Sequence, residues 1–553
     1  MSRPSDHIDA PAPPRPDDTI TQPKLGPIGY LRFFWRQLTS MRTALFLLLL
    51  LAIAAVPGSL VPQRSSDPNG VTQYFDDNPG LAPVIDAVQG FDVYTSVWFS
   101  SIYLLLFVSL IGCVIPRTLH HARALRSKPP KTPARLDRLE GFTSVDVPDG
   151  DITAPSAIEQ ARAVLRKAGY RVRIYDAPNS LSVSAERGYT RETGNLVFHT
   201  ALIGVLVSVG IGGGFGYTGQ KVLVEGDSFA NVLLSYESFL PGRFFSDDVL
   251  QPYRLTLDDF SVDYEEDNAD ALGQPTDYTA SVTTRAVSAD GVEGAGEQHE
   301  IKVNDPLRYG GNDIYLLGNG YAPVITVRDG DGNIAYSQAV PFLPQGDANL
   351  TSLGVVKVPD ALPEQLGMIG FFYPTAAQLS TGAFTSNYPD LLNPVLSLQV
   401  FTGDLRLDDG VYALDTTGMT EIAGRDVATP SIQLTPGQTV DLPNGAGSVT
   451  FENADPDAAA NDLSGSVPRF VSLDIHRDPS QGWVLLFALL VLGGLLTSLF
   501  IPRRRIWVKA VDSGAGIRLE YAGLARGDDP GLERAVRDIA GRHTQVLGLK
   551  LTE

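Results

Sequence analysis

The chain has 553 residues, a formal net charge of −20 and 43% hydrophobic residues, and it is too long for a single hydrophobic core. Its one cysteine excludes an intramolecular disulfide, a Cys-x-x-Cys oxidoreductase centre and a Cys-x-x-Cys-His haem attachment site. We therefore expect two or three folded units that perform none of these chemistries.

The N-terminal segment is predicted to lie outside the hydrocarbon core of a membrane. Residues 1–27 are rich in Pro and Asp and show no apolar period, which predicts a disordered cytoplasmic tail. Residues 28–42 combine aromatic side chains with Arg32 and Arg36. That mixture is typical of a helix lying in the membrane interface.

Four uncharged apolar windows of roughly 20 residues are long enough to cross about 30 Å of hydrocarbon. They predict membrane-spanning helices at residues 43–61, 97–115, 194–215 and 482–501. A signal peptide would account for one such window near the N-terminus, but not for four along the chain. The sequence thus predicts a polytopic α-helical membrane protein.

Basic residues orient the four predicted spans. They are Lys24, Arg32, Arg36 and Arg42 before the first span, Arg117, Arg123, Arg126, Lys128 and Lys131 after the second, Arg187 and Arg191 before the third, and Arg503, Arg504 and Arg505 after the fourth. Residues 62–96 contain a single basic residue, Arg64, among several aspartates. Because basic flanks stay in the cytoplasm, both termini are expected inside, and residues 62–96 and 216–481 outside.

Residues 116–193 and 502–553 are both expected on the cytoplasmic side. In the first, a capping-box pattern at Ser156 and Glu159 precedes an apolar helical stripe, and two alternating runs follow Gly169. The second shows two strand patterns and a helix in another order. Since neither segment buries much apolar surface alone, we expect the two to pack together as one small α+β cytoplasmic domain.

Residues 216–481 carry the acidity of the chain, with about 12 basic and about 38 acidic residues and a net charge of roughly −26. Short strand patterns separated by Gly, Pro, Asn and Asp predict a large extracytoplasmic all-β domain, similar to a β-sandwich or a pair of them. The charge argues against nucleic acid as a partner. A basic protein partner fits it, and solubility alone would also explain it.

His199 is the candidate for a functional group inside the membrane. It lies about one turn inside the third predicted span, and no other residue of the four windows titrates near neutral pH. An ionisable residue at this depth is costly and commonly functional, and neutral imidazole is a common ligand of haem iron. The alternative is a structural histidine hydrogen-bonded to a neighbouring helix or to Asn195, and the residues alone leave both open.

The other histidines give weaker signals. His476 precedes the fourth span at a depth that an external haem could reach, although its charged neighbours explain it equally well as an interfacial anchor. His120 and His121 follow the second span among arginines, and we expect them to contact lipid headgroups. His299 lies in a polar stretch beside no partner that the sequence identifies.

Short motifs occur in a fixed order along the chain. They are residues 40–44 (SMRTA), 57–63 (PGSLVPQ), 96–99 (SVWF), 113–117 (CVIPR), 186–188 (ERG), 194–199 (GNLVFH), 303–309 (VNDPLRY) and 477–479 (RDP). Together they resemble the ResB family of cytochrome c biogenesis proteins over most of the chain. One departure is Leu316, where the family pattern has Gln.

The resemblance implies a subunit of a bacterial cell-membrane complex that assists haem export and covalent haem attachment to apocytochrome c. ResB-like proteins work with a ResC-like polytopic subunit that carries a Trp-rich haem-binding segment, and the four scattered Trp of this chain form no such segment. The chain is therefore expected to be part of a cytochrome c synthase complex rather than an enzyme alone. Apocytochrome c and membrane lipid are the other partners implied.

The resemblance also implies a transiently bound haem. His199 would be an iron ligand, the second axial ligand would come from the partner subunit, and His476 is a further candidate. No catalytic residue and no metal other than haem iron is expected. The rival hypothesis is a membrane-anchored structural or sensory protein whose outer domain binds envelope material without haem. A sensor would have no need of His199.

Overall fold

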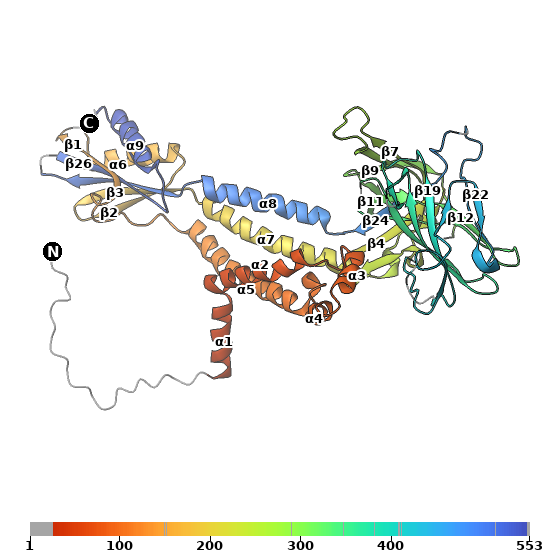
Figure 1. Ribbon diagram of the computed structural model, residues 1–553. Helices are drawn as coiled ribbons and strands as arrows, with labels where there is room; N and C mark the ends of the chain where they lie inside the picture. Colours follow the sequence, from red (N-terminus) through yellow and green to blue (C-terminus); the bar gives the residue numbers. More distant parts are fainter. Residues whose placement is uncertain are drawn as a thin grey trace. The chain divides into compact units, whose positions relative to one another are not determined.

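The computed structural model describes residues 26–549, except residues 149, 151, 289, 347, 381, 407–409, 411, 460 and 515. The predicted disordered tail at residues 1–27 lies almost entirely outside the described residues. The chain divides into two compact units (Figure 1). The first unit is Met1–Val209 with Gly482–Glu553, and the second unit is Gly210–Gln481.

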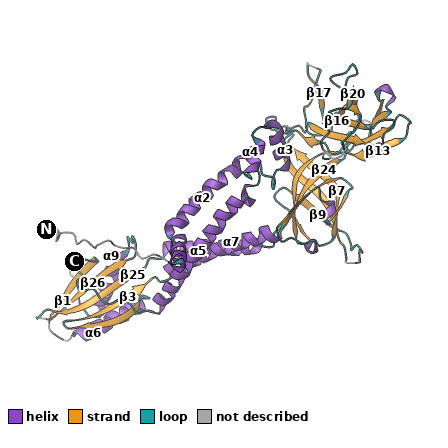
Figure 2. Cartoon of the chain, turned by 90° about the horizontal axis from the view of Figure 1, so that it is seen from below, coloured by secondary structure: helices purple, strands orange, loops and turns teal. Residues whose placement is uncertain are grey.

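Among the described residues, four helices are long and apolar enough to cross a membrane: α2 (Met41–Leu60), α5 (Val97–Arg126), α7 (Thr190–Phe215) and α8 (Gln481–Phe500), all labelled in Figure 1. Figure 2 shows helices in purple and strands in orange. Each contains one of the apolar windows of the sequence almost completely. Leu and Val side chains on their outer surfaces are exposed, as expected for surfaces that lipid would cover. The prediction of a polytopic α-helical membrane protein is confirmed.

Helix α5 is longer than its apolar window. The window ends at Ile115, but the helix has 30 residues and continues through Pro116 to Arg126, about 16 Å farther along its axis. Pro116 removes one backbone hydrogen bond without ending the helix. The extension carries His120 and His121 away from the apolar core.

The predicted interfacial helix is α1 (Pro27–Leu38), which stops before α2 begins. Ser40 caps α2 by accepting a hydrogen bond from the backbone N–H of Thr43 at 3.2 Å. Helix α5 holds the break between α1 and α2, because Ser109 Oγ donates to the Leu38 carbonyl at 2.6 Å and Cys113 Sγ donates to the Thr39 carbonyl at 2.8 Å.

Residues 62–96 fold into a small helical cap, with helices α3 (Pro68–Asp77) and α4 (Ala82–Ala87) and the 3₁₀ turn Val93–Thr95. Phe91 is fully buried at its centre and packs against two aromatic rings of α3. The Gln63 side chain stabilises the cap, since Nε2 donates to the Gly90 carbonyl and Oε1 accepts from the Val93 N–H, both at 3.0 Å.

The segment between α5 and α7 and the segment after α8 form one α+β domain, as predicted. Its five-stranded antiparallel sheet has the order β1-β26-β25-β3-β2. The elements are β1 (Glu140–Pro148), α6 (Ala154–Lys167), β2 (Arg171–Ala177), β3 (Ser180–Arg187), β25 (Arg504–Asp512), β26 (Gly516–Ala525) and α9 (Leu532–Val546). Helices α6 and α9 pack together against the sheet, and Ile158, Leu165 and Val536 are fully buried between them and the strands.

The capping-box prediction for α6 is wrong by one turn. The cap is Thr153, whose Oγ1 accepts from the Ser156 N–H at 3.4 Å, and the helix begins at Ala154. Pro155 fits the first turn of a helix because its missing N–H needs no partner there. Ser156 therefore lies inside the helix.

The second unit is built of β-strands around two cores. The first core lies between two sheets and includes Leu223, Leu255, Ile314 and Leu473. One sheet has the order β10-β11-β24-β4-β6, with β10 (Leu307–Tyr309), β11 (Asn312–Tyr321), β24 (Arg469–Arg477), β4 (Tyr217–Val224) and β6 (Ser238–Pro241). The other has the order β5-β7-β8-β9, with β5 (Ser228–Ala230), β7 (Tyr253–Tyr264), β8 (Pro275–Ala286) and β9 (Glu297–Lys302).

The second core includes Phe342, Phe372 and Phe451. One of its sheets contains β13 (Ile334–Ala339), β12 (Val324–Arg328), β23 (Ser448–Phe451) and β22 (Gln438–Asp441). The other contains β14 (Leu343–Pro344), β15 (Ser352–Val358), β16 (Leu366–Tyr373), β19 (Val395–Thr402), β20 (Thr420–Ala423) and β21 (Ile432–Leu434). A separate hairpin joins β17 (Ala376–Gln378) and β18 (Phe384–Ser386). Two cores of facing sheets agree with the predicted large all-β domain.

Strand pairing brings together the two places where the second unit meets membrane helices. Strand β4 follows α7 and strand β24 precedes α8, and the two pair antiparallel with Tyr217 opposite Arg477. Gly216 permits this approach, since a Cβ there would lie 2.4 Å from the Arg477 carbonyl oxygen. The chain therefore leaves α7 and enters α8 at neighbouring points of one sheet.

Candidate functional site

His199 lies on α7, and its hydrogen bond identifies the tautomer of its ring. Nδ1 is 2.7 Å from the carbonyl oxygen of Asn195, four residues earlier. A carbonyl oxygen only accepts, so Nδ1 carries a proton, and in the neutral ring Nε2 then carries the free electron pair. Among the described residues, no hydrogen-bond partner contacts Nε2. The ring is half-buried, and its Nε2 could bind a metal ion whose other ligands come from a cofactor or a partner.

The packing of α7 on α8 leaves His199 outside the contact between these helices. Gly194 and Gly494 face each other, and a Cβ on Gly494 would lie 2.7 Å from the Gly194 carbonyl oxygen. His199 follows Gly194 by five residues, which turns it about 140° from this contact. Its face of α7 is shared with Leu206, whose carbonyl accepts from Tyr103 of α5 at 2.7 Å. His199 thus lies on the α5 side of α7.

A cavity of about 400 Å³ adjoins the turn of α7 that precedes His199. Helix α5 contributes Arg117, His120 and His121, helix α7 contributes Glu192 and Asn195, and Arg526 follows β26. Asn195 and His199 are four residues apart, so they share a face of the helix. Side chains of a helix lean toward its N-terminus, which inclines His199 toward this cavity.

The prediction for His121 is wrong. Its side chain is buried rather than facing lipid headgroups, with Nδ1 3.2 Å from Glu192 Oε2 and Nε2 3.0 Å from Thr193 Oγ1. The reason is the extension of α5, which brings this residue against the first turn of α7. His120, one position earlier, is exposed, and its contact with headgroups stays a prediction.

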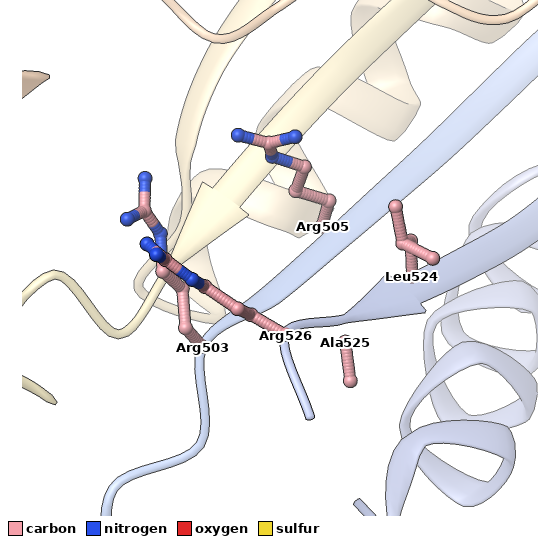
Figure 3. Close-up of a pocket in the computed structure, with 5 residues that line it drawn as sticks. All are labelled: Arg503, Arg505, Leu524, Ala525 and Arg526. Atoms are coloured by element: carbon pink, nitrogen blue, oxygen red, sulfur yellow. The ribbon is translucent and has the colours of Figure 1, made fainter. Parts of the chain in front are cut away.

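A cluster of arginines and glutamates lies beside the cavity. We call it the arginine–glutamate cluster: Glu186, Glu192, Arg503, Arg505 and Arg526. Arg503 donates to Glu186 through Nε at 3.0 Å and through a terminal nitrogen at 2.6 Å, and Arg505 donates to the same carboxylate at 3.1 Å. Arg503 and Arg526 also pair with Glu192. Figure 3 shows the three arginines around a second pocket of about 310 Å³.

The environment of the cluster keeps Glu186 charged. Burial raises the pKa of Glu186, but hydrogen bonds from Tyr189 and Arg503 outweigh burial and hold the pKa below its ordinary value. Burial together with the hydrogen bond to Glu186 raises the pKa of Tyr189 to about 12. Tyr189 is therefore a neutral hydrogen-bond donor, and the cluster is a fixed set of charges at physiological pH.

The remaining histidine candidates lie in the second unit. His476 is on β24, and its Nδ1 is 2.9 Å from Oγ1 of Thr218 on the paired strand β4. His299 is on β9, with Nε2 3.0 Å from Thr284 Oγ1. Because His476 has one nitrogen bound to a hydroxyl within a sheet, it fits a structural role as well as a ligand role. His199 and His476 belong to different units.

Comparison with known proteins decides the family. The profile of the ResB-like family matches residues 41–537. The chain belongs to the ResB-like family. Proteins named "Cytochrome c biogenesis protein CcsB" are similar to it. That of Synechococcus sp. (strain RCC307) is 27% identical over 366 residues, which cover 60% of this chain and 75% of the relative.

Two further relatives of the same name give shorter alignments. The protein of Synechococcus sp. (strain CC9311) is 28% identical over 314 residues, covering 54% of this ResB-like chain and 62% of the relative. The protein of Paulinella chromatophora is 25% identical over 291 residues, covering 50% and 60%. The chain therefore spans less than two thirds of these two relatives.

The donor set of this ResB-like chain suits haem better than a bare metal ion. Among the described residues, no group of three or more His, Cys, Asp or Glu side chains is placed to hold a metal ion. A porphyrin supplies four nitrogens to its iron, so one imidazole nitrogen is a sufficient protein ligand. The free Nε2 of His199 would be sufficient as that ligand. The sequence indicated His199, but gave no signal for the cavity or for the pairing of His121.

Proposed function

We propose that this chain is a subunit of a membrane complex for c-type cytochrome biogenesis that assists haem export and covalent haem attachment to apocytochrome c. The family and the names of its relatives support the process. The single observation that carries the haem role is the His199 tautomer. Because Nδ1 donates its proton to the Asn195 carbonyl, Nε2 is the nitrogen that the neutral ring would offer to iron.

His199 would act by holding and orienting the iron of a transiently bound haem. The hydrogen bond from Nδ1 to a backbone carbonyl would fix the tautomer and the orientation of the ring, as second-sphere partners of metal-bound histidines do. When bound, haem supplies the vinyl groups to which the cysteine thiols of apocytochrome c add. The single cysteine of this chain, Cys113, is not available for that step, because its thiol donates a hydrogen bond to the Thr39 carbonyl at the break between α1 and α2.

A ResC-like subunit would complete the site. It would supply the Trp-rich haem-binding segment and the second axial ligand, so the chain is part of a cytochrome c synthase complex and contributes no catalytic residue. We place this complex in the bacterial cell membrane with both termini cytoplasmic, from the basic flanks of the spans. Residues 216–481 would then be extracytoplasmic, where their negative charge would attract a basic surface of apocytochrome c. His476 would be a second ligand candidate on that side.

The test is the absorption spectrum of the detergent-purified chain co-expressed with its ResC-like partner. We expect a Soret band that is lost or shifted in His199→Ala and restored by added imidazole. His299→Ala is the matched control, because it removes a hydrogen-bonded histidine from the second unit, and its spectrum should equal that of the wild type. An unchanged spectrum in His199→Ala would return His199 to a structural role. Absence of haem from the wild type would favour the structural or sensory hypothesis.

A further inference from the structure

The cavity beside His199 carries more positive than negative charge. Its lining contains the guanidinium groups of Arg117 and Arg526 and one carboxylate, Glu192. Glu192 is already bound by Arg503, Arg526 and His121. The negative charge in the cavity is therefore neutralised by the protein itself, and the positive charge that remains available to a ligand is that of Arg117.

Arg117 is the least committed of these cations. In the described part of the chain its only hydrogen bond runs to Met41 Sδ, at 3.0 Å. A thioether sulfur is a weak acceptor and carries no charge, so this contact leaves the guanidinium without a counter-ion. Arginine binds a carboxylate through two parallel N–H donors, and such charge-assisted bonds are about twice as strong as neutral ones. Arg117 thus has the chemistry of a carboxylate site.

The position of the cavity relates it to iron at His199. Asn195 lines the cavity, and its backbone carbonyl accepts the hydrogen bond from His199 Nδ1–H, so the two features share one helical turn. Four residues of helix separate their Cα atoms by about 6 Å along the axis. The cavity begins where the apolar window of α7 meets its polar first turn. A ligand bound through Nε2 therefore has apolar surroundings on one side and cationic side chains on the other.

Haem has this same division, with an apolar ring and two carboxylates on one edge. We propose that the cavity lined by Arg117, His120 and Arg526 binds the carboxylates of the haem whose iron is held by His199. This inference rests on the proposed function and adds a second contact between haem and this chain. Carboxylates entering the membrane boundary require cationic partners, because an unpaired charge there is strongly disfavoured. The Arg117 guanidinium would be the main partner of the haem carboxylates, and the cavity would orient haem with these carboxylates toward the α+β domain.

The experiment compares ferric haem with its dimethyl ester, which keeps the iron and ring but has no carboxylate. Both are titrated into the haem-depleted complex of this chain with its ResC-like partner, and binding is followed by the Soret band. The wild type should bind haem at least about tenfold more tightly than the ester, the ratio expected for one charge-assisted hydrogen-bonded pair. Arg117→Gln should weaken haem binding about tenfold, leave ester binding unchanged and keep the Soret position. Arg117→Lys should retain part of the affinity.

Arg123→Gln is the matched control, since Arg123 is an exposed arginine of the same helix outside the cavity lining. Its affinities for haem and ester should equal those of the wild type. Equal binding of haem and ester by the wild type, or an equal effect of Arg117→Gln on both, would overturn the proposal. So would loss of phosphatidylglycerol binding in Arg117→Gln with unchanged haem affinity, which would assign the cavity to a lipid headgroup. A failure of the proposed function is separate: His199→Ala would then leave the Soret band of both ligands unchanged.

Discussion

Glu186 is the residue whose neutralisation should most disturb the junction between α7 and the α+β domain. Its side chain is 3% exposed, and it accepts hydrogen bonds from Arg503, Arg505 and Tyr189. Glu186→Gln preserves the shape of the side chain and removes the charge. Among the described residues, Arg503, whose side chain is 10% exposed, then keeps one carboxylate partner, Glu192.

The magnitude follows from burial. Breaking a buried ion pair by removing one partner costs about 3–5 kcal/mol, because the other charge stays desolvated. The second partner of Arg503 places Glu186→Gln at the lower end, about 3 kcal/mol. The exposed pair Arg518–Asp146, with side chains 49% and 70% exposed, gives the comparison. Arg518→Gln should cost less than about 1 kcal/mol, since water screens such pairs.

The assay is thermal unfolding of the detergent-purified protein, followed by the fluorescence of Trp507 in a background where Trp35, Trp98 and Trp483 are replaced by Phe. Trp507 is buried in β25, next to the cluster, so its fluorescence reports on the α+β domain. We expect Tm to fall by about 10 °C in Glu186→Gln and by no more than a few degrees in Arg518→Gln. A similar fall in both variants would refute the reasoning from burial.

Two further predictions concern other parts of the first unit. His543 Nε2 donates to the Ala157 carbonyl and Nδ1 accepts from Tyr521 Oη, both at 2.8 Å, and burial lowers the pKa of His543 although the first bond raises it. Below about pH 6.5 the unfolded chain then binds more protons than the folded chain, so Tm should be constant above that pH and fall as the pH decreases. His543→Gln should reduce the slope of Tm against pH. An unchanged slope in the variant would contradict the prediction. Gly494→Val should destabilise the protein by about 1–3 kcal/mol in thermal unfolding, because its Cβ would lie 2.6 Å from the Phe198 backbone nitrogen. Gly493→Val is its control, since no heavy atom lies within 4 Å of that Cβ, and equal Tm values for the two variants would argue against close packing of α7 on α8.

The membrane spans could be predicted from the sequence because one property determines them. A segment that crosses hydrocarbon must be apolar over its full length, and composition alone measures this. The same property does not mark where helix α5 ends. Hydropathy reports where the apolar surface ends at Ile115, whereas the helix continues for as long as its backbone hydrogen bonds do, to Arg126.

The α+β domain could be predicted in part. Its existence follows from two segments that are each too small to fold alone, and the sheet joins them as expected. The strand order and β1 were not predictable, since they depend on pairs such as Val145 with Leu519, far apart in the sequence. Local patterns also competed: Thr153 and Ser156 both fit a helix cap, and Pro155 at the first turn decides between them.

In the candidate site, too, the features encoded by local sequence could be predicted, and those that depend on packing could not. His199 was found because an imidazole in an apolar window is unusual in itself. The burial of His121 and the cavity beside Asn195 depend on how α5 and α7 pack, and no local pattern encodes that packing. Glu192 illustrates the difference: in the sequence it is an ordinary acidic residue in the first turn of a helix, and in the fold it is the shared partner of His121, Arg503 and Arg526.

The two roles that the sequence left open for His199 are compatible, because they use different ring nitrogens. Nδ1 takes the structural role by donating to the Asn195 carbonyl. That bond leaves Nε2 without a hydrogen-bond partner among the described residues. Under the proposed function, the iron of haem would bind this nitrogen while Nδ1 keeps its structural bond, and the haem carboxylates would lie toward the cationic cavity one turn away.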